Sequence, residues 1–85
     1  MSYEVVVERK ARKAMARLPS AVYGRLMEAV GALAEDPRPF PQSQKLEGRE
    51  GRRLRVGNYR VLYRVDDERQ EVSILEVWHR QRDYR

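Results

Sequence analysis

The stretch RRLRVGNYRVLYRV, residues 52–65, contains two segments in which apolar and arginine side chains alternate, separated by a Gly-Asn pair. Two alternating segments joined by two turn-forming residues predict a tight β-hairpin. With Gly57 and Asn58 in the turn, Arg55 is predicted to face Arg60 across the two strands. Because successive side chains of a strand point to opposite faces, one face of this hairpin is predicted to be apolar and the other rich in arginine.

Positive charge is concentrated in and beside this hairpin. The chain has a net charge of +5, and residues 49–64 contain six arginines and one acid, so this segment alone accounts for the net charge. Arg53 is predicted to lie on the same face as Arg55 and Arg60. Like charges that face each other destabilise a sheet, and the forked arginine side chain binds a phosphate at two points. The pattern therefore predicts binding of a polyanion such as RNA or DNA.

Two other interpretations of the arginines need no ligand. The excess of arginine over lysine, fifteen to three, is also typical of a compositional preference or of a thermophilic source. Alternatively, the face is solvated and neutralised by acids of the next strand, such as Glu71 opposite Arg64. Composition alone does not explain the clustering, and the predicted register places no acid near Arg55 and Arg60.

Length and composition limit the class of protein. Eighty-five residues suit a single domain, residues 1–85, with one modest core. The lack of cysteine excludes disulfides and zinc–thiolate sites, and the single histidine excludes a multi-histidine metal site, so we expect no metal and no cofactor. No apolar run reaches the ~20 residues of a membrane span, and the first residues do not resemble a signal peptide. A soluble, cytoplasmic protein is expected.

The rest of the chain predicts an α+β fold. Pro19 separates two segments with helical apolar periodicity, and a segment rich in proline and glycine precedes the hairpin. The expected elements are a strand at residues 3–8, helices at 9–18 and 20–35, a loop at 36–51, and strands at 52–56, 59–65 and 71–78. Ser20 is expected to cap the second helix. The order β-α-α-β-β-β predicts a helical hairpin packed on one face of a small antiparallel sheet.

The C-terminal residues WHRQRDYR, 78–85, add side chains that suit metal-free phosphodiester cleavage. Arg80 and Arg82 can neutralise a phosphate, His79 can transfer a proton, and the ring of Tyr84 can stack on a base. Taken alone, the segment also fits a surface histidine and a tyrosine that anchors the terminus.

Over essentially its whole length the chain resembles the RelE/ParE superfamily of toxins from type II toxin–antitoxin systems. The resemblance rests on the order of elements and on three segments: KLEG at 45–48, RLRVGNYRVLYRVDDE at 53–68 and VWHRQRDYR at 77–85. It is closest to RelE-like toxins, which cut mRNA in the ribosomal A site. ParE-like toxins share the fold but inhibit DNA gyrase without cleaving RNA.

This resemblance implies a ribosome-dependent mRNA endoribonuclease that inhibits translation. It implies metal-free cleavage, in which the ribose 2′-hydroxyl attacks the adjacent phosphate. The implied partners are the ribosome with its mRNA and a cognate RelB-like antitoxin, with DNA contacted only indirectly through the antitoxin complex and no membrane involved. The alternatives are a ParE-like gyrase inhibitor and a binding module without activity.

The resemblance also implies roles for single residues. Arg60 matches the phosphate-binding arginine of the family, Arg80 the arginine that assists the leaving group, and Tyr84 the tyrosine that stacks on the substrate base. Arg53 stands where RelE carries a catalytic lysine, and Gly51 stands where RelE carries a second one. Arginine is almost always protonated and is a poor general base. The residues expected to bind RNA without reacting are Lys45, Arg55 and Arg82.

His79 is therefore the better candidate for proton transfer, but its orientation conflicts with that of Arg80. If the last strand alternated strictly from Glu71, His79 would share the face of Arg60, and Trp78 and Arg80 would point to the core. The resemblance instead requires Arg80 in the site. A bulge or the end of the strand near Trp78 would reconcile the two expectations.

Overall fold

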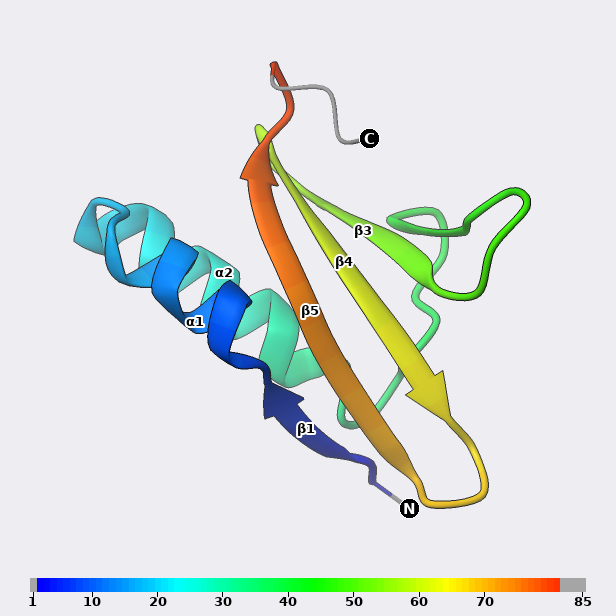
Figure 1. Cartoon of the computed structure of the whole chain (residues 1–85). Coiled ribbons are helices and arrows are strands. Elements are labelled where there is room, and N and C mark those ends of the chain that lie inside the picture. The colour runs from blue at the N-terminus through cyan, green and yellow to red at the C-terminus, as the bar shows by residue number, and fades with distance from the viewer. Residues whose placement is uncertain (1, 82–85) are drawn as a thin grey trace.

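A computed structural model describes residues 2–81 of the chain. Two helices pack on one face of a five-stranded sheet (Figure 1). The α+β class and the helical hairpin are therefore as the sequence predicts. None of the helices in residues 2–81 is long and apolar enough to cross a lipid bilayer.

The sheet is mixed, and the prediction of a purely antiparallel sheet is wrong for one pair of strands. The strand order is β1-β5-β4-β3-β2, with β1 parallel to β5 and every other pair antiparallel. Between β1 and β5 the chain passes through the two helices and three other strands. Strand β5 then runs beside β1 in the same direction. The strands are β1 (Glu4–Val7), β2 (Ser43–Lys45), β3 (Arg52–Val56), β4 (Tyr59–Asp66) and β5 (Glu71–His79).

Strand β2 lies inside the segment that the sequence predicts as a loop. It has three residues and pairs with β3 at the edge of the sheet, with Ser43 opposite Leu54. A strand this short, between prolines and glycines, has no apolar alternation that would reveal it.

The two helices are α1 (Arg9–Ala16) and α2 (Ser20–Ala32). Pro19, not Ser20, occupies the N-cap position of α2, so the predicted serine cap is wrong. The apolar stripes of the helices bury their side chains against the sheet, as predicted. The buried core consists of Ala11, Met15, Leu26, Val30 and Leu33 from the helical side and Leu54, Val61, Tyr63, Val72 and Ile74 from the strands.

The hairpin of β3 and β4 has the predicted register. Arg55 pairs with Arg60, and the turn consists of Gly57 and Asn58. Gly57 has a φ of +57°, whereas Asn58 keeps a negative φ. A positive φ at the first turn position alone matches a type II′ turn, in which glycine is favoured there. The turn thus holds two arginines opposite each other on rigid strands.

A β-bulge in β5 changes the register between β4 and β5. Tyr63 pairs with Ile74 and Leu62 pairs with Glu76, so Leu75 is the extra residue. Beyond Leu75 every side chain of β5 lies on the face opposite to the one that strict alternation predicts.

The consequence is read from the pairs at the end of the strand. Trp78 pairs with Arg60, and His79 pairs with Tyr59, whose ring packs against the core. The expectation that His79 shares the face of Arg60 is therefore wrong. A bulge resolves the conflict in the sequence, although it lies three residues before Trp78.

A buried hydrogen-bond network fastens β2 and the loop before it to the centre of the sheet. The Tyr63 hydroxyl donates to the Pro37 carbonyl oxygen at 2.7 Å. Its single hydrogen is then used, so the Ser43 hydroxyl donates to the Tyr63 oxygen and itself accepts from Arg52 Nε at 2.8 Å. The ring of Tyr63 is fully buried. Because buried polar groups need partners, this chain of bonds fixes where the loop lies.

Tyr63→Phe should lower the free energy of unfolding by about 1–3 kcal/mol, because it leaves a buried serine hydroxyl and a carbonyl oxygen without their shared partner. Urea unfolding measures the change as a lower midpoint with an unchanged slope. The control is Tyr23→Phe, since Tyr23 lies on α2 and is 44% exposed. Equal midpoints for the two variants would contradict a structural role for the network.

Candidate functional site

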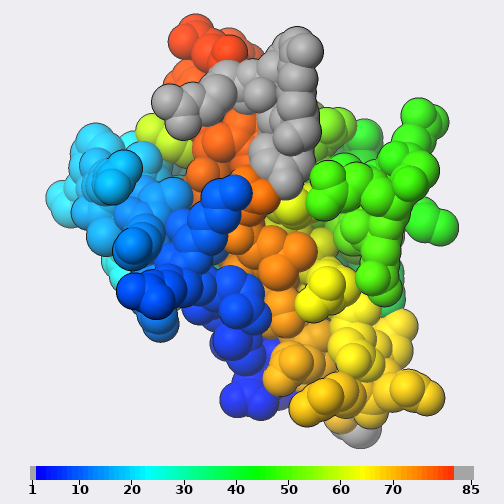
Figure 2. All heavy atoms as spheres, viewed as in Figure 1, coloured from blue at the N-terminus to red at the C-terminus, as the bar shows by residue number. Residues whose placement is uncertain are grey.

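Three arginines of the hairpin lie together on the face of the sheet that the helices do not cover. Arg53 and Arg55 come from β3 and Arg60 comes from β4, and we call these three residues the arginine face. In the space-filling view, atoms of β5 are visible between α1 and the segment around residue 50 (Figure 2). The predicted clustering of these arginines is therefore present in the fold.

The arginine face borders a shallow cavity of about 100 Å³. The cavity is lined by Arg53, Arg55, Arg60, Pro41, Gln42 and Gln44, and none of these residues is acidic. Gln44 is one of the lining residues because β2 pairs with β3 and places Gln44 opposite Arg53. Guanidinium and amide groups are hydrogen-bond donors, so the cavity suits a phosphate oxygen.

Arg60 is held at the edge of this cavity by its own turn. Its Nη1 donates to the carbonyl oxygens of Tyr59 at 2.9 Å and Gly57 at 3.2 Å. Partial burial lowers the pKa of the guanidinium, and the positive charges of Arg53, Arg55 and Arg80 lower it further. The group is therefore charged at neutral pH but held in surroundings that disfavour its charge.

Arg80 lies close enough to Arg60 for its positive charge to act there, but it does not line the cavity. It follows directly after β5, and its backbone N–H donates to the Asn58 carbonyl oxygen at 2.7 Å. This bond fixes the end of β5 to the hairpin turn. Its charge acts on Arg60, and the bulge at Leu75 makes this arrangement possible by placing Trp78 opposite Arg60.

His79 lies apart from this cluster. Its ring packs edge-on against Tyr59, with ring centroids 5.1 Å apart and planes at 78°. Its Nδ1 accepts a hydrogen bond from the Gln81 backbone N–H at 3.2 Å. A neutral ring in this arrangement carries its proton on Nε2. His79 is thus a neighbour of the arginine face at the strand end and not one of the residues that line the cavity.

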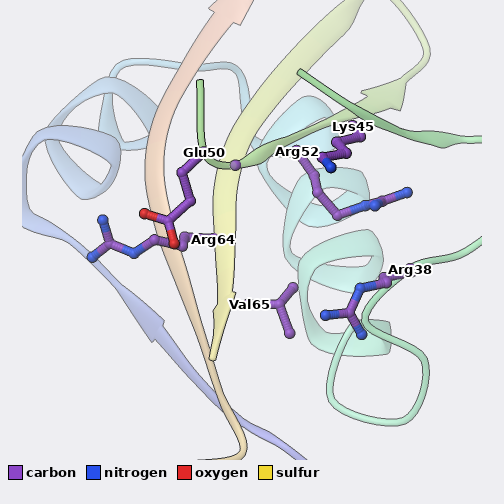
Figure 3. Close-up of a pocket in the computed structure, with 7 residues that line it drawn as sticks. Arg38, Lys45, Glu50, Arg52, Arg64 and Val65 are labelled. Atoms are coloured by element: carbon purple, nitrogen blue, oxygen red, sulfur yellow. The ribbon is translucent and has the colours of Figure 1, made fainter. Parts of the chain in front are cut away.

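Lys45 is also separated from the arginine face. It pairs with Arg52, and both alternate away from Arg53. The two side chains instead line a second cavity of about 280 Å³ with Arg38, Glu50, Gly51, Arg64 and Val65 (Figure 3).

This second cavity has mixed charge. In Figure 3 the carboxylate of Glu50 points toward Arg64. Arg38 binds both carboxylate oxygens of Asp67, at 2.8 and 3.3 Å, and this pairing lowers the pKa of Asp67. Arg52 is engaged with Ser43. The cavity therefore offers a polyanion less uncompensated positive charge than the arginine face does.

Tyr84 and Arg82, the remaining predicted site residues, lie outside the described residues. Within residues 2–81, no group of three or more histidine, cysteine, aspartate or glutamate side chains is arranged to hold a metal ion. Sequence reasoning missed three residues that line the cavity, Pro41, Gln42 and Gln44. Gln44 was missed because its strand has no recognisable pattern.

Comparisons with known proteins agree on one family. The family described as "ParE toxin of type II toxin-antitoxin system, parDE" matches residues 5–84. The toxin RelG of Mycobacterium tuberculosis is 36% identical over 86 residues, which cover 100% of this chain and 99% of RelG. The toxin RelE of the same organism is 33% identical, over 98% of this chain and 87% of its own length.

Solved structures of similar proteins have the same fold. The archaeal RelE–RelB complex from Pyrococcus horikoshii OT3 contains a chain that matches with a TM-score of 0.81 and 30% identity, over 98% of this chain and 100% of that one. The toxin–antitoxin complex RelBE2 from Mycobacterium tuberculosis matches with a TM-score of 0.81 and 35% identity, over 94% and 100% of the two chains.

Removing the charge of Arg60 should not destabilise the fold. The pKa of Arg60 is lower in the folded chain than in the unfolded one, so folding disfavours the charged form at every pH below the folded value. Arg60→Gln should therefore keep or raise the urea midpoint, by an amount that is constant between pH 5 and 9. Arg69→Gln, in the turn between β4 and β5, is the charge-matched control. A loss above about 1 kcal/mol would mean that the bonds to Tyr59 and Gly57 outweigh the repulsion.

Proposed function

Because the chain belongs to the RelE/ParE superfamily of toxins from type II toxin–antitoxin systems, we propose that it cuts mRNA on the ribosome and thereby inhibits translation. The observation that carries this proposal is the cluster of Arg53, Arg55 and Arg60 along a cavity without acids, together with the charge of Arg80 that acts on Arg60. Such a cluster suits a phosphate on which negative charge increases during a reaction.

The proposed reaction is attack of a ribose 2′-hydroxyl on the adjacent phosphate. The new bond to phosphorus forms as the bond to the 5′-oxygen of the next nucleotide breaks, leaving a 2′,3′-cyclic phosphate and a free 5′-hydroxyl. One proton leaves the 2′-hydroxyl and one is delivered to the departing oxygen. Arg53, Arg55 and Arg60 neutralise the phosphate, and Arg80 stabilises the departing oxygen.

Proton transfer is assigned to His79 in this proposal. It is the single histidine of the chain, and histidine is the side chain whose ordinary pKa lies closest to neutrality. It stands next to Arg80 at the end of β5, with its ring against Tyr59 and outside the residues that line the cavity. Tyr84 is proposed to stack on a substrate base, and Arg82 and Lys45 to bind the RNA backbone.

The alternative activity, inhibition of DNA gyrase, has less support. The relatives that match at 33–36% identity are named RelE and RelG toxins. RelE carries lysines where this chain has Arg53 and Gly51. A binding module without nuclease activity is therefore the other alternative to test. Translating ribosomes and DNA gyrase, assayed side by side with the same protein, separate the three possibilities.

We also propose a RelB-like antitoxin as the cognate partner, because similar toxins are found in RelE–RelB complexes. An acidic partner would neutralise the arginine face, and an amphipathic helix would cover apolar surface near the helices or the sheet edge. Contact with DNA is proposed to occur only through that complex. The cytoplasm, where the ribosome and its mRNA are found, is the proposed location.

Arg60→Ala should lower cleavage of ribosome-bound mRNA by about 150-fold, which corresponds to about 3 kcal/mol of lost transition-state stabilisation. Arg60→Lys should restore part of the activity, because a single ammonium group cannot bind a phosphate at two points. The measurement is the cleavage rate on programmed ribosomes, with growth arrest in parallel. Arg69→Ala removes a positive charge elsewhere and should cleave normally. A folded, fully active Arg60→Ala would move the chemistry away from the arginine face and favour the gyrase alternative.

His79→Gln should lower the cleavage rate at least about 100-fold and leave ribosome binding nearly unchanged, because glutamine cannot transfer a proton near neutral pH. His79→Phe keeps an aromatic ring against Tyr59 and should be equally inactive. If His79→Phe cleaved normally, the loss in His79→Gln would be due to altered packing and not to the missing proton transfer. Equal losses of binding and cleavage in both variants would make His79 a binding residue.

A further inference from the structure

Phe40 is exposed to an unusual degree. Its exposed fraction is 91%, compared with 44% for Tyr23 and 38% for Met27, the other large apolar side chains exposed in the described part of the chain. Burying an aromatic ring is favourable by about 1.5–3 kcal/mol, so a ring left in water contributes almost nothing to the stability of the fold. A single exposed apolar side chain is ordinary on a protein surface, so the case for a ligand depends on the groups near Phe40.

Phe40 is attached directly to the wall of the cavity at the arginine face. The next two residues, Pro41 and Gln42, line that cavity together with the three arginines. The turn that carries Phe40 is held at both ends: the Ser43 N–H donates to the Pro39 carbonyl oxygen at 2.8 Å, and the Arg55 N–H donates to the Gln42 carbonyl oxygen at 2.9 Å. The backbone that carries the exposed ring is therefore fixed next to the wall of this cavity.

We propose that Phe40 is a stacking platform for a nucleobase of the RNA whose phosphate lies on the arginine face. This inference rests on the proposed function and extends it to a residue that positions the substrate. Single-stranded RNA is bound by proteins that combine a positively charged surface with exposed aromatic rings, because the charges hold the backbone and the rings stack on the bases. The three arginines that line the cavity supply the charge, and Phe40, which directly precedes the lining residues Pro41 and Gln42, supplies the exposed ring.

The surroundings favour a base over an apolar segment of a protein. An amphipathic helix needs a row of apolar contacts, and the other large exposed apolar side chains, Tyr23 and Met27, lie on α2. The residues after Phe40 that line the cavity are proline, glutamine and arginine. A single aromatic ring can stack on one base, and guanidinium and amide groups can form hydrogen bonds with the edge of that base.

The test measures affinity for ribosomes programmed with an mRNA whose 2′-hydroxyls at the cleavage site are replaced by 2′-O-methyl groups, so that binding is separated from reaction. Phe40→Ala should weaken binding by about 5- to 100-fold, Phe40→Leu should weaken it nearly as much, and Phe40→Tyr should bind like the wild type. All three should keep the wild-type urea midpoint, because the ring is 91% exposed. Tyr23→Ala removes an exposed aromatic ring on α2 and should bind normally.

A second set of mRNAs, each with one abasic nucleotide near the cleavage site, identifies the base. At one position the loss of the base should weaken binding to the wild type but have no further effect on Phe40→Ala, since each change removes the same contact. Additive losses at every position would overturn the inference, as would unchanged RNA binding together with weaker binding of a RelB-like antitoxin.

Failure of this inference is distinguishable from failure of the proposed function. If the wild type cleaves mRNA and Phe40→Ala binds programmed ribosomes equally well, the stacking platform is wrong and the nuclease proposal stands. If the wild type neither binds nor cleaves, the nuclease proposal and the inference that rests on it both fail.

Discussion

One extra residue in β5 determines which side chains gather around the arginine face. Without Leu75 as a bulge, the side chains that follow would alternate to the other face of the sheet, and Trp78 would point to the core instead of lying opposite Arg60. The same shift turns His79 toward Tyr59. Bulges are typical of sites where a strand must redirect a side chain, and here the redirected segment is the one that brings Arg80 to the cluster.

The arginine face costs the fold stability, and the structure offsets this cost on the other side of the sheet. Arg60 lies partly buried among like charges, whereas the opposite face of the same hairpin packs Leu54, Val61 and Tyr63 into the core. The Tyr63 network adds buried hydrogen bonds that hold β2 and its loop. A small protein can tolerate arginines that repel each other on one face of a strand when the opposite face of that strand is packed in the core.

How far the sequence predicts a feature of this structure depends on how close together in the chain the residues that determine it are. The register of β3 with β4 follows from local alternation and a Gly-Asn turn, and it is confirmed residue by residue. Strand β2 and the parallel pairing of β1 are not predictable locally, because one is too short and the other joins distant segments. The clustering of Arg53, Arg55 and Arg60 follows from the register. The separation of Lys45 from the arginine face does not follow from this register. It depends on strand β2, which the sequence pattern does not reveal.

The parallel pairing of β1 with β5 has a consequence during protein synthesis. Residues 4–7 leave the ribosome long before their partners, residues 71–74, so β1 cannot join the sheet until β5 has been made. Arg80 is made later still, and its backbone bond to Asn58 cannot form before then. The hairpin arginines are thus made before Arg80, which follows Arg60 by 20 residues, and the cluster is incomplete during that interval. The order in which the polypeptide emerges delays the assembly of the four-arginine cluster until β5 has been made.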